Sequence, residues 1–388
     1  MSYYNTGTPK FYVDHLLWYK SFGMGAFLNN PDVEGLVPQD IWTLNPSKTT
    51  HNLSQDGAMI EPISIEDGEE TGLEWKYGYI FKTPTIFDVN YVALLGHDLA
   101  SSPAWQPGAS FMNVIGFSTG GASINYAYDY SITNSVNLGQ ETSSRRMESL
   151  SYDGYTLWEF EAPPAGTNII NMLTLGIGAL GSSDMWLPIN LGALSIGTTF
   201  KMPHAPDLSL TLGYEYTGNK SVQTLGGTTI SNTYWTRPSP WVNNLGAFEL
   251  QEPLDAGGYN KKLARSGRRT WDLSFSFLDD KNVFGPNHSL SFTANAEGID
   301  ASKPPSSDYD ADGDIVTGNA MRTNLLTDDN FYSSVIHKTN GGALPFIFQP
   351  DSNDNTNFAL ARFDMNTFQF KQVAHRAYNV SVKIVETW

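Results

Sequence analysis

The alternation of side chains in residues 351–388 constrains the fold more than any other feature of the chain. A loop rich in Asp and Asn leads there into F-A-L-A-R-F-D-M-N-T-F-Q-F-K-Q-V-A-H-R-A-Y-N-V-S-V-K-I-V-E-T-W. Two sets of residues are spaced by two: Phe358, Leu360 and Arg362, then Tyr378, Val380, Val382 and Ile384. This spacing places each set on one face of a strand. We therefore expect the chain to finish inside a β-sheet with Trp388 as its final residue, an ending that suggests a part built to fit into an assembly.

The composition also favours strands over helices. Aromatic residues make up 13% of the chain and charged residues only 16%, with 35 Gly and 21 Pro. This profile is typical of many short strands joined by tight turns. At 388 residues the chain exceeds the size at which a single core stops growing. We therefore predict an all-β protein with two domains.

The charge and the cysteine content exclude several classes of protein. The chain has 40 acidic and 23 basic residues, a net charge of -17, which disfavours a dedicated nucleic-acid binder because such proteins supply Lys and Arg to the phosphates. It contains no cysteine, so disulfides and thiolate chemistry are ruled out, and nothing prevents folding in a reducing cytoplasm. We expect no specific nucleic-acid partner.

No segment is typical of export or of a membrane span. The N-terminus, M-S-Y-Y-N-T-G-T-P-K-F-Y-V-D, lacks the basic and apolar regions of a signal peptide. The most apolar region, residues 169–196, is interrupted by several Gly, by Pro188 and by Asp184. A membrane helix needs about 20 consecutive apolar residues. We therefore expect no membrane partner.

Several further segments are predicted to be strands. We expect a first strand and its turn in residues 9–22, a sandwich from residues 86–99, 156–161, 168–178 and 191–203, and a half-solvated strand in residues 207–217. Gly226 and Gly227 predict a turn at 224–229. In residues 268–278, four residues are expected to share one face: Trp271, Leu273, Phe275 and Phe277. Residues 300–320 are poor in apolar side chains and are predicted to be an excursion or loop.

The segment D-Y-D-A-D-G-D-I-V-T-G-N is a candidate calcium loop. Asp308, Asp310 and Asp312 stand at loop positions one, three and five, and Asp314 would contribute its carbonyl oxygen. Asn319 occupies position twelve, where the closing bidentate Glu belongs, so the affinity would be lowered. The alternative is a solvated acidic loop. No cofactor is required, and calcium is the candidate that the sequence offers.

A basic cluster stands out in this acidic chain: Lys261, Lys262, Arg265, Arg268 and Arg269. Such a cluster suits either a phosphate or an acidic neighbouring subunit. We favour the subunit, because a self-assembling acidic protein needs local complementary charge at its interfaces. Plain surface charge is the alternative.

No catalytic constellation is evident. Gly176, Gly178 and Gly181 have the G-x-G-x-x-G spacing, but Pro188 stands where the following helix would run. The seven histidines are dispersed without metal-ligand spacing. Glu159 and Glu161 share a strand face without an obvious partner, which indicates exposed carboxylates. We therefore predict that the protein is not an enzyme.

The first half of the chain resembles a known β-sheet family. The run V-N-Y-V-A-L-L-G-H-D-L (89–99), with the strand around Trp158 and L-G-I-G (175–178) downstream, resembles the galactose-binding-like jelly rolls of discoidin and coagulation-factor C domains, in variants that occur within phage structural proteins. The resemblance covers about residues 30–200. It implies an antiparallel jelly-roll domain over residues 31–199, in a family whose members hold sugars or lipids with loop residues.

The rest of the chain is similar to structural proteins of tailed bacteriophages, most of all the distal-tail or baseplate class. The resemblance is carried by T-P-K-F-Y-V-D at the start, D-L-S-L-T-L-G-Y-E-Y, R-S-G-R-R-T-W-D-L-S-F-S-F-L, and A-Y-N-V-S-V-K-I-V-E near the end. It covers residues 1–30 and 200–388. It implies a β-barrel or β-sandwich ring domain that is split by the jelly roll, so that the first strand pairs with strands formed much later in the sequence.

These features lead to a main functional hypothesis and to alternatives. The main one is a non-enzymatic virion component, assembled in the host cytoplasm, which forms a trimeric or hexameric ring around the tail, contacts other tail or baseplate proteins and displays the jelly roll outward. A capsid decoration protein would have a similar sequence. A carbohydrate-binding module for host adsorption would present aromatic faces to a host-surface glycan, and its candidates are Trp105, Tyr155 and Trp241. An acidic β-sandwich hydrolase is the third hypothesis, although no acid and base pair supports it.

Overall fold

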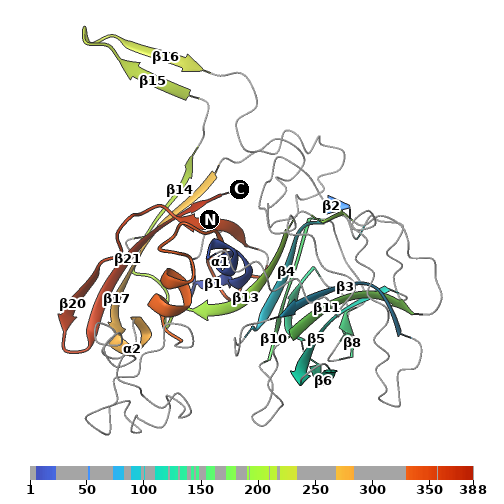
Figure 1. The fold of residues 1–388 in the computed structure, drawn as a ribbon. Helices are drawn as coiled ribbons and strands as arrows, with labels where there is room; N and C mark the ends of the chain where they lie inside the picture. The colour runs from blue at the N-terminus through green and yellow to red at the C-terminus, as the bar shows by residue number, and fades with distance from the viewer. Residues whose placement is uncertain are drawn as a thin grey trace.

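Most of the described part of the molecule is antiparallel β-sheet (Figure 1). The structure is a computed structural model. It describes residues 6–22, 51–52, 73–82, 89–97, 100, 110–120, 123–129, 132–137, 141–143, 146–147, 154–161, 172–180, 190–191, 193–208, 210–215, 219–233, 268–283, 329–355 and 357–387. The predicted all-β character is confirmed.

The largest sheet has 11 strands, all paired in antiparallel fashion. In spatial order they are β14 (Thr211–Glu215), β17 (Arg268–Asp279), β21 (Ala377–Glu386), β19 (Ala359–Phe363), β18 (Phe346–Gln349), β1 (Lys10–Asp14), β13 (Ala193–Lys201), β4 (Tyr91–His97), β10 (Gly154–Phe160) and β7 (Ile132–Val136), with β20 (Phe370–Ala374) paired to β21. Non-consecutive neighbours such as β18 and β1 show that segments far apart in sequence build this sheet.

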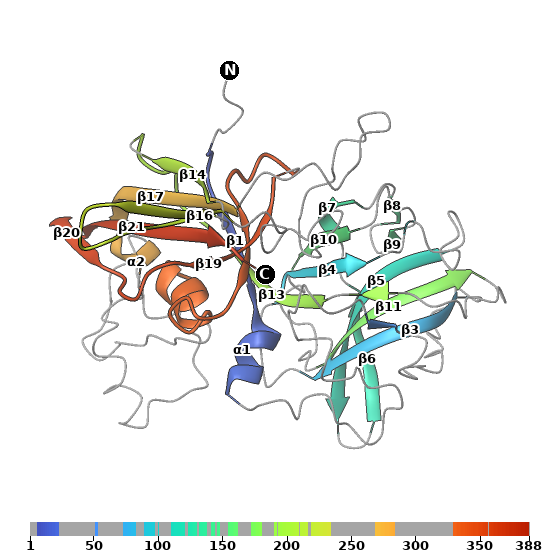
Figure 2. The ribbon, with the colours of Figure 1, turned by 90° about the horizontal axis from the view of Figure 1, so that it is seen from above.

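A second sheet has six strands and lies on the β4 and β10 side of the molecule in both views (Figures 1 and 2). Its strands are β3 (Leu73–Lys82), β11 (Met172–Leu180), β5 (Ser110–Gly120), β9 (Arg146–Met147) and β8 (Glu141–Ser143), with β6 (Ser123–Asp129) paired to β5. Two two-stranded sheets complete the set: β12 (Asn190–Leu191) with β2 (His51–Asn52), and β15 (Asn219–Gln223) with β16 (Thr229–Thr233).

Three short helices occur among the described residues. They are α1 (His15–Ser21), α2 (Asp280–Val283) and a π-helix, η6 (Tyr332–His337). Helix α1 replaces the turn that we expected after the first strand. Its start is explained by Asp14, whose Oδ1 accepts the backbone N–H of Leu17 at 3.1 Å. A carboxylate in this position satisfies a free N–H group of the first helical turn.

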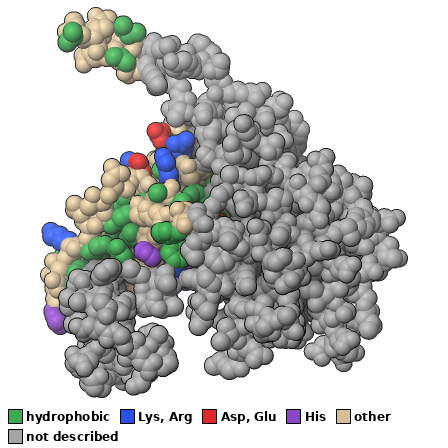
Figure 3. Space-filling view, viewed as in Figure 1, with side chains coloured by type: hydrophobic (Ala, Val, Ile, Leu, Met, Phe, Trp, Pro, Cys, Tyr) green, Lys and Arg blue, Asp and Glu red, His purple; other side chains and the backbone are tan. Residues whose placement is uncertain are grey.

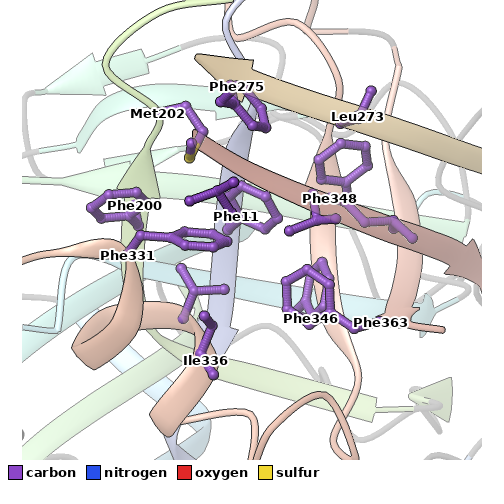
Figure 4. Close-up of a cluster of buried hydrophobic side chains, with 14 of the residues drawn as sticks. Phe11, Phe200, Met202, Leu273, Phe275, Phe331, Ile336, Phe346, Phe348 and Phe363 are labelled. Carbon is purple, nitrogen blue, oxygen red and sulfur yellow. The ribbon is translucent and has the colours of Figure 1, made fainter. Parts of the chain in front are cut away.

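The central strand β1 is buried on both faces. Phe11 and Val13 belong to one cluster of buried side chains, the phenylalanine core, and Tyr12 belongs to another, the tyrosine core. The Phe11 ring centroid lies 5.3 to 6.1 Å from those of four other rings in the phenylalanine core, which Figure 4 shows around it: Phe331, Phe346, Phe348 and Phe363. The tyrosine core on the opposite face contains Tyr12, Tyr91, Tyr155, Leu157 and Phe358.

The neighbouring strand β18 divides its side chains in the same way. Phe346 and Phe348 enter the phenylalanine core, whereas Ile347 enters the tyrosine core. A strand buried on both faces has a nearly continuous apolar sequence, as F-I-F in β18 and F-Y-V in β1 do. The pairing of β1 with β18 confirms that the first strand joins strands formed much later in the sequence.

The largest sheet is continuous where we expected a domain boundary. Strand β13 (Ala193–Lys201) spans position 199, and it pairs with β1 on one side and β4 on the other. All the strands that follow β1 away from β13 come from the predicted ring domain, and β4, β10 and β7 come from the predicted jelly roll. The division into residues 1–30 with 200–388 and residues 31–199 stays a prediction.

Strand β17 departs from the predicted alternation at Phe277. Trp271, Leu273 and Phe275 are buried as expected, but the Phe277 side chain is 76% exposed and Leu278 is buried instead. The cause is a β-bulge: the register between β17 and β21 shifts between Phe275 and Leu278, and Phe277 has a φ of 62°. An extra residue in one strand reverses the faces of all later side chains. The prediction that Phe277 shares the buried face is therefore wrong.

Candidate assembly surface

A hairpin of two strands, β15 and β16, stands away from both larger sheets (Figure 1). We name residues 219–233 the arm. It follows β14, which among the described strands is paired on one side only, to β17. The predicted turn is confirmed: the Gly227 N–H donates to the Thr224 carbonyl at 2.9 Å, and Gly227 has a φ of 81° that glycine adopts without steric cost.

The two faces of the arm differ, because one carries an apolar pair next to Lys220 and Asn232 and the other carries only polar residues. Val222 is paired with Ile230 across the two strands, so both side chains lie on the same face. They are 65% and 58% exposed, and Leu225 at the tip is fully exposed. The opposite face holds Ser221 paired with Ser231, and Gln223 paired with Thr229. Figure 3 shows hydrophobic side chains on the arm, at the end of the molecule farthest from the sheets.

The exposed apolar side chains of the arm would gain free energy if another surface covered them. A lone two-stranded hairpin is marginally stable in water. Full burial of a Val, Leu or Ile side chain contributes about 1.5 to 3 kcal/mol, so covering the exposed parts of these three would add about 3 to 7 kcal/mol. The arm also contains one Lys and no Asp or Glu, in a chain with 40 acidic residues. It can therefore approach an acidic surface without charge repulsion.

The described part of the basic cluster is divided between two environments. Arg268 opens β17 opposite Glu215 of β14, close to the base of the arm, and is half-buried. Arg269 instead points into the protein: its Nη2 lies 2.7 Å from Glu386 Oε1 and its Nε 3.1 Å from Oε2. Lys261, Lys262 and Arg265 lie outside the described residues. The interface role of the cluster stays a prediction, but Arg269 has an internal partner.

The Arg269 and Glu386 pair fixes the end of β21 against the start of β17. Glu386 has no exposed surface, and its Oε2 also accepts the backbone N–H of Arg269 at 3.0 Å. The guanidinium group donates further to Asn357 Oδ1 at 3.0 Å and to the Phe358 carbonyl at 2.7 Å. A buried charge pair is tolerated when its hydrogen bonds are satisfied in this way.

The other predicted site residues are mostly outside the described part of the chain. Asp308, Asp310, Asp312, Asp314 and Asn319 are among them, so the calcium loop stays a prediction, as do Trp105 and Trp241 as glycan contacts. Tyr155 is described, and it is only 2% exposed, with its ring centroid 6.1 Å from that of Phe358. It is therefore a core aromatic and offers no face to a sugar. Across the described residues, no group of three or more Asp, Glu or His side chains is placed to hold a metal ion.

The glycine-rich segment around residue 176 forms a strand. This agrees with the sequence analysis, which rejected a nucleotide-binding loop at this position. Gly176 and Gly178 lie in β11 and are paired with both β3 and β5. Gly181 lies outside the described residues. A phosphate-binding loop would leave its strand here and enter a helix.

Sequence reasoning missed the partners of Glu159. We expected an exposed carboxylate, but its side chain is 14% exposed, with Oε2 at 2.6 Å from Lys10 Nζ and Oε1 at 2.6 Å from the Tyr12 hydroxyl. The Tyr12 hydroxyl also lies 2.9 Å from Gln349 Oε1. Burial and then the Glu159 charge raise the pKa of Tyr12 far above its usual range, so the phenol stays protonated. Glu161, two residues on, is exposed.

Helix α1 places a histidine in the interior. His15 is 2% exposed, and its Nε2 lies 3.0 Å from Thr198 Oγ1. Burial, with a further contribution from the positive charge of Lys338, holds the pKa of His15 well below its ordinary value. The imidazole is therefore neutral at physiological pH and contributes to packing beside Trp18.

Comparison with known proteins places the chain in no group. No protein-family model matches it, no curated protein matches it and no solved structure matches it. Within the described residues, no helix is long and apolar enough to cross a membrane.

Proposed function

We propose that this chain is a non-enzymatic structural subunit of a bacteriophage virion, a distal-tail or baseplate component that assembles into a ring around the tail. The observation that carries the proposal is the arm, a hairpin that exposes Val222, Leu225 and Ile230 and whose segment lacks acidic residues. A projecting β-hairpin of this kind suits contact with a neighbouring subunit. The large antiparallel sheet supplies the rigid base from which it projects.

The subunit would act by assembling with other copies and would catalyse no reaction. Each arm adds a modest amount of buried apolar surface, and association costs about 4 to 15 kcal/mol of translational and rotational freedom. One arm would therefore give weak pairing. In a closed ring every subunit both gives and receives such a contact, so the contacts reinforce one another. The predicted jelly roll, residues 31–199, would face outward, and other tail or baseplate proteins would bind the ring.

The molar mass of the purified protein tests this function. Light scattering after size exclusion, over a range of concentrations and with either calcium or a chelator, should show a discrete oligomer, threefold or sixfold. A chelator that dissociates the oligomer would promote residues 308–319 from a loop to a calcium site. A monomer at every concentration, alone and with tail proteins, would contradict the proposal.

A further inference from the structure

A tight turn, T-N-G-G (339–342), follows the π-helix η6. Consecutive residues in it have a positive φ: 51° at Asn340, 67° at Gly341 and 90° at Gly342. Asparagine is one of the few residues with a side chain that visits this conformation routinely, and glycine adopts it without steric cost. The turn therefore favours Asn at position 340 followed by Gly at position 341.

The Asn–Gly pair that the turn favours is chemically labile. Asparagine is a thermolabile residue, and it reacts most readily before glycine, because glycine has no side chain to obstruct the approach of its backbone nitrogen. When the Gly341 nitrogen attacks Cγ of Asn340, the new N–Cγ bond closes a succinimide ring. The Cγ–Nδ2 bond breaks, and the backbone proton leaves with the amide as ammonia. Water then opens the ring to aspartate or isoaspartate.

The folded protein exposes this pair to water but restrains both reacting groups. Asn340 and Gly341 are exposed. The Gly341 N–H donates to the Ile336 carbonyl at 2.8 Å, and Asn340 Nδ2 donates to the Ser21 hydroxyl oxygen at 2.7 Å. Ring closure needs a free Gly341 N–H and a rotation of the Asn340 side chain. Both hydrogen bonds therefore slow the reaction.

The product of the reaction cannot keep the contact with Ser21 as it stands. Ser21 Oγ donates to the Trp18 carbonyl at 2.6 Å, and a hydroxyl has only one proton to donate. It can accept from the Asn340 amide, but a carboxylate at position 340 would bring two acceptors together. Ser21 is also the last residue of α1. A negative charge is unfavourable at this end of a helix.

The Ser21 contact lies at the exposed end of the interface between α1 and the segment after η6. Trp18 is 4% exposed, and its ring centroid lies 5.5 Å from that of His337, three residues before Asn340. His15, at the start of α1, is also buried. Loss of the Ser21 contact should therefore loosen the last turn of α1 and leave its first turn in place.

We propose that Asn340 is a site of spontaneous deamidation that helix α1 controls. The Ser21 contact slows the reaction, and the product carboxylate weakens that contact. No oxidant, metal or second protein is needed, and the sequence contains no other Asn–Gly pair. Because the lost ammonia is not regained, modified chains accumulate with the age of the protein. The inference is independent of the proposed function.

Peptide mapping by mass spectrometry, after incubation at mildly alkaline pH, measures the rate. The unprotected reference is the synthetic peptide I-H-K-T-N-G-G-A-L, residues 336–344. The folded protein should react more slowly than the peptide, by about tenfold, because two hydrogen bonds must open. Ser21→Ala should raise the rate in the protein by about two- to tenfold. Ser221→Ala, at an exposed serine of the arm, is the matched control and should leave the rate unchanged.

The effect of the product on α1 is measured with Asn340→Asp, which places the carboxylate in every chain. Amide hydrogen exchange in the last turn of α1 should become faster by about two- to tenfold, while exchange in β1 stays the same. Asn366→Asp adds the same charge at an exposed position outside this turn and is the control.

Each part of the inference has a result that would overturn it. A folded protein that stays unmodified while the peptide reacts completely would show that Asn340 is not a modification site. Equal rates in the wild type and in Ser21→Ala would show that α1 does not control the reaction. Unchanged hydrogen exchange in Asn340→Asp would show that the product does not loosen α1.

Discussion

Strand β1 and the arm are both extended segments, but they differ in how many neighbours cover them. Strand β1 has a paired strand on each side and a core against each face, and four of its five residues are buried. Each strand of the arm is paired only with the other, and Val222, Leu225 and Ile230 remain exposed. The comparison teaches that the fold is held by the strands around β1. The arm adds little to that fold, so its apolar residues are available for another surface.

The largest effect should come from opening the core beside β1. Phe11→Ala removes a ring with no exposed surface that is packed among four others, and it should lower the free energy of unfolding by about 4 kcal/mol. Chemical denaturation monitored by tryptophan fluorescence measures this. Phe22 is an exposed phenylalanine. If Phe22→Ala lowered the free energy of unfolding as much as Phe11→Ala does, the comparison would fail.

A slightly smaller loss should follow from removing the charge of Glu386. Glu386→Gln removes the negative charge that faces the Arg269 guanidinium group in the interior. The free energy of unfolding should therefore fall by about 3 kcal/mol. The same denaturation experiment measures it. Asp364→Asn is the control, because Asp364 pairs with Lys383 at 2.6 Å on the surface, where both side chains are about half exposed. That change should leave the unfolding midpoint in place.

The pH dependence of stability tests the same comparison at His15, the residue that follows β1 directly. Because burial lowers the pKa of His15 in the folded protein, the unfolded chain binds the proton more readily, below about pH 6.5. The free energy of unfolding should therefore decrease as the pH falls below that value, by up to about 1.4 kcal/mol per pH unit. His15→Gln should reduce this slope in thermal melts taken from pH 7 to 5. An unchanged slope would contradict the prediction, and His375→Gln is the control at an exposed position.

The smallest effect on stability is expected in the arm. Val222→Thr with Ile230→Thr keeps the branched shape of both side chains and should change the free energy of unfolding by less than about 0.5 kcal/mol, because neither side chain packs against the sheets. Thermal unfolding of the monomer at low concentration measures this. A loss comparable to that of Phe11→Ala would mean that the arm belongs to the fold.

Where local pattern decides the structure, the sequence was sufficient. The apolar runs that became β4, β10, β13 and β21 were recognised, and the Gly226 and Gly227 turn was placed correctly. Side-chain spacing and turn chemistry act over a few residues, so one sequence contains that information.

Features that depend on distant residues were missed. The bulge at Phe277 is set by how β17 and β21 pair, about 100 residues apart in the chain. Glu159 meets Lys10 across 149 residues, and no spacing rule reports such a contact. The exposed face of the arm was also unforeseen, because Val222 and Ile230 have the pattern of an ordinary half-buried hairpin. Only the absence of a covering layer among the described elements distinguishes it.

The position of β1 between β13 and β18 also governs how the chain can fold during its synthesis. Tyr12 contacts Gln349 across 337 residues. At roughly 5 to 20 residues per second, the ribosome takes roughly 20 to 70 s to make the intervening chain. During that interval one edge of β1 has no strand to pair with, so the nascent sheet stays open at its centre. The largest sheet can therefore close around β1 only after β18 has been made, and a chaperone that shields that edge should raise the yield of folded protein.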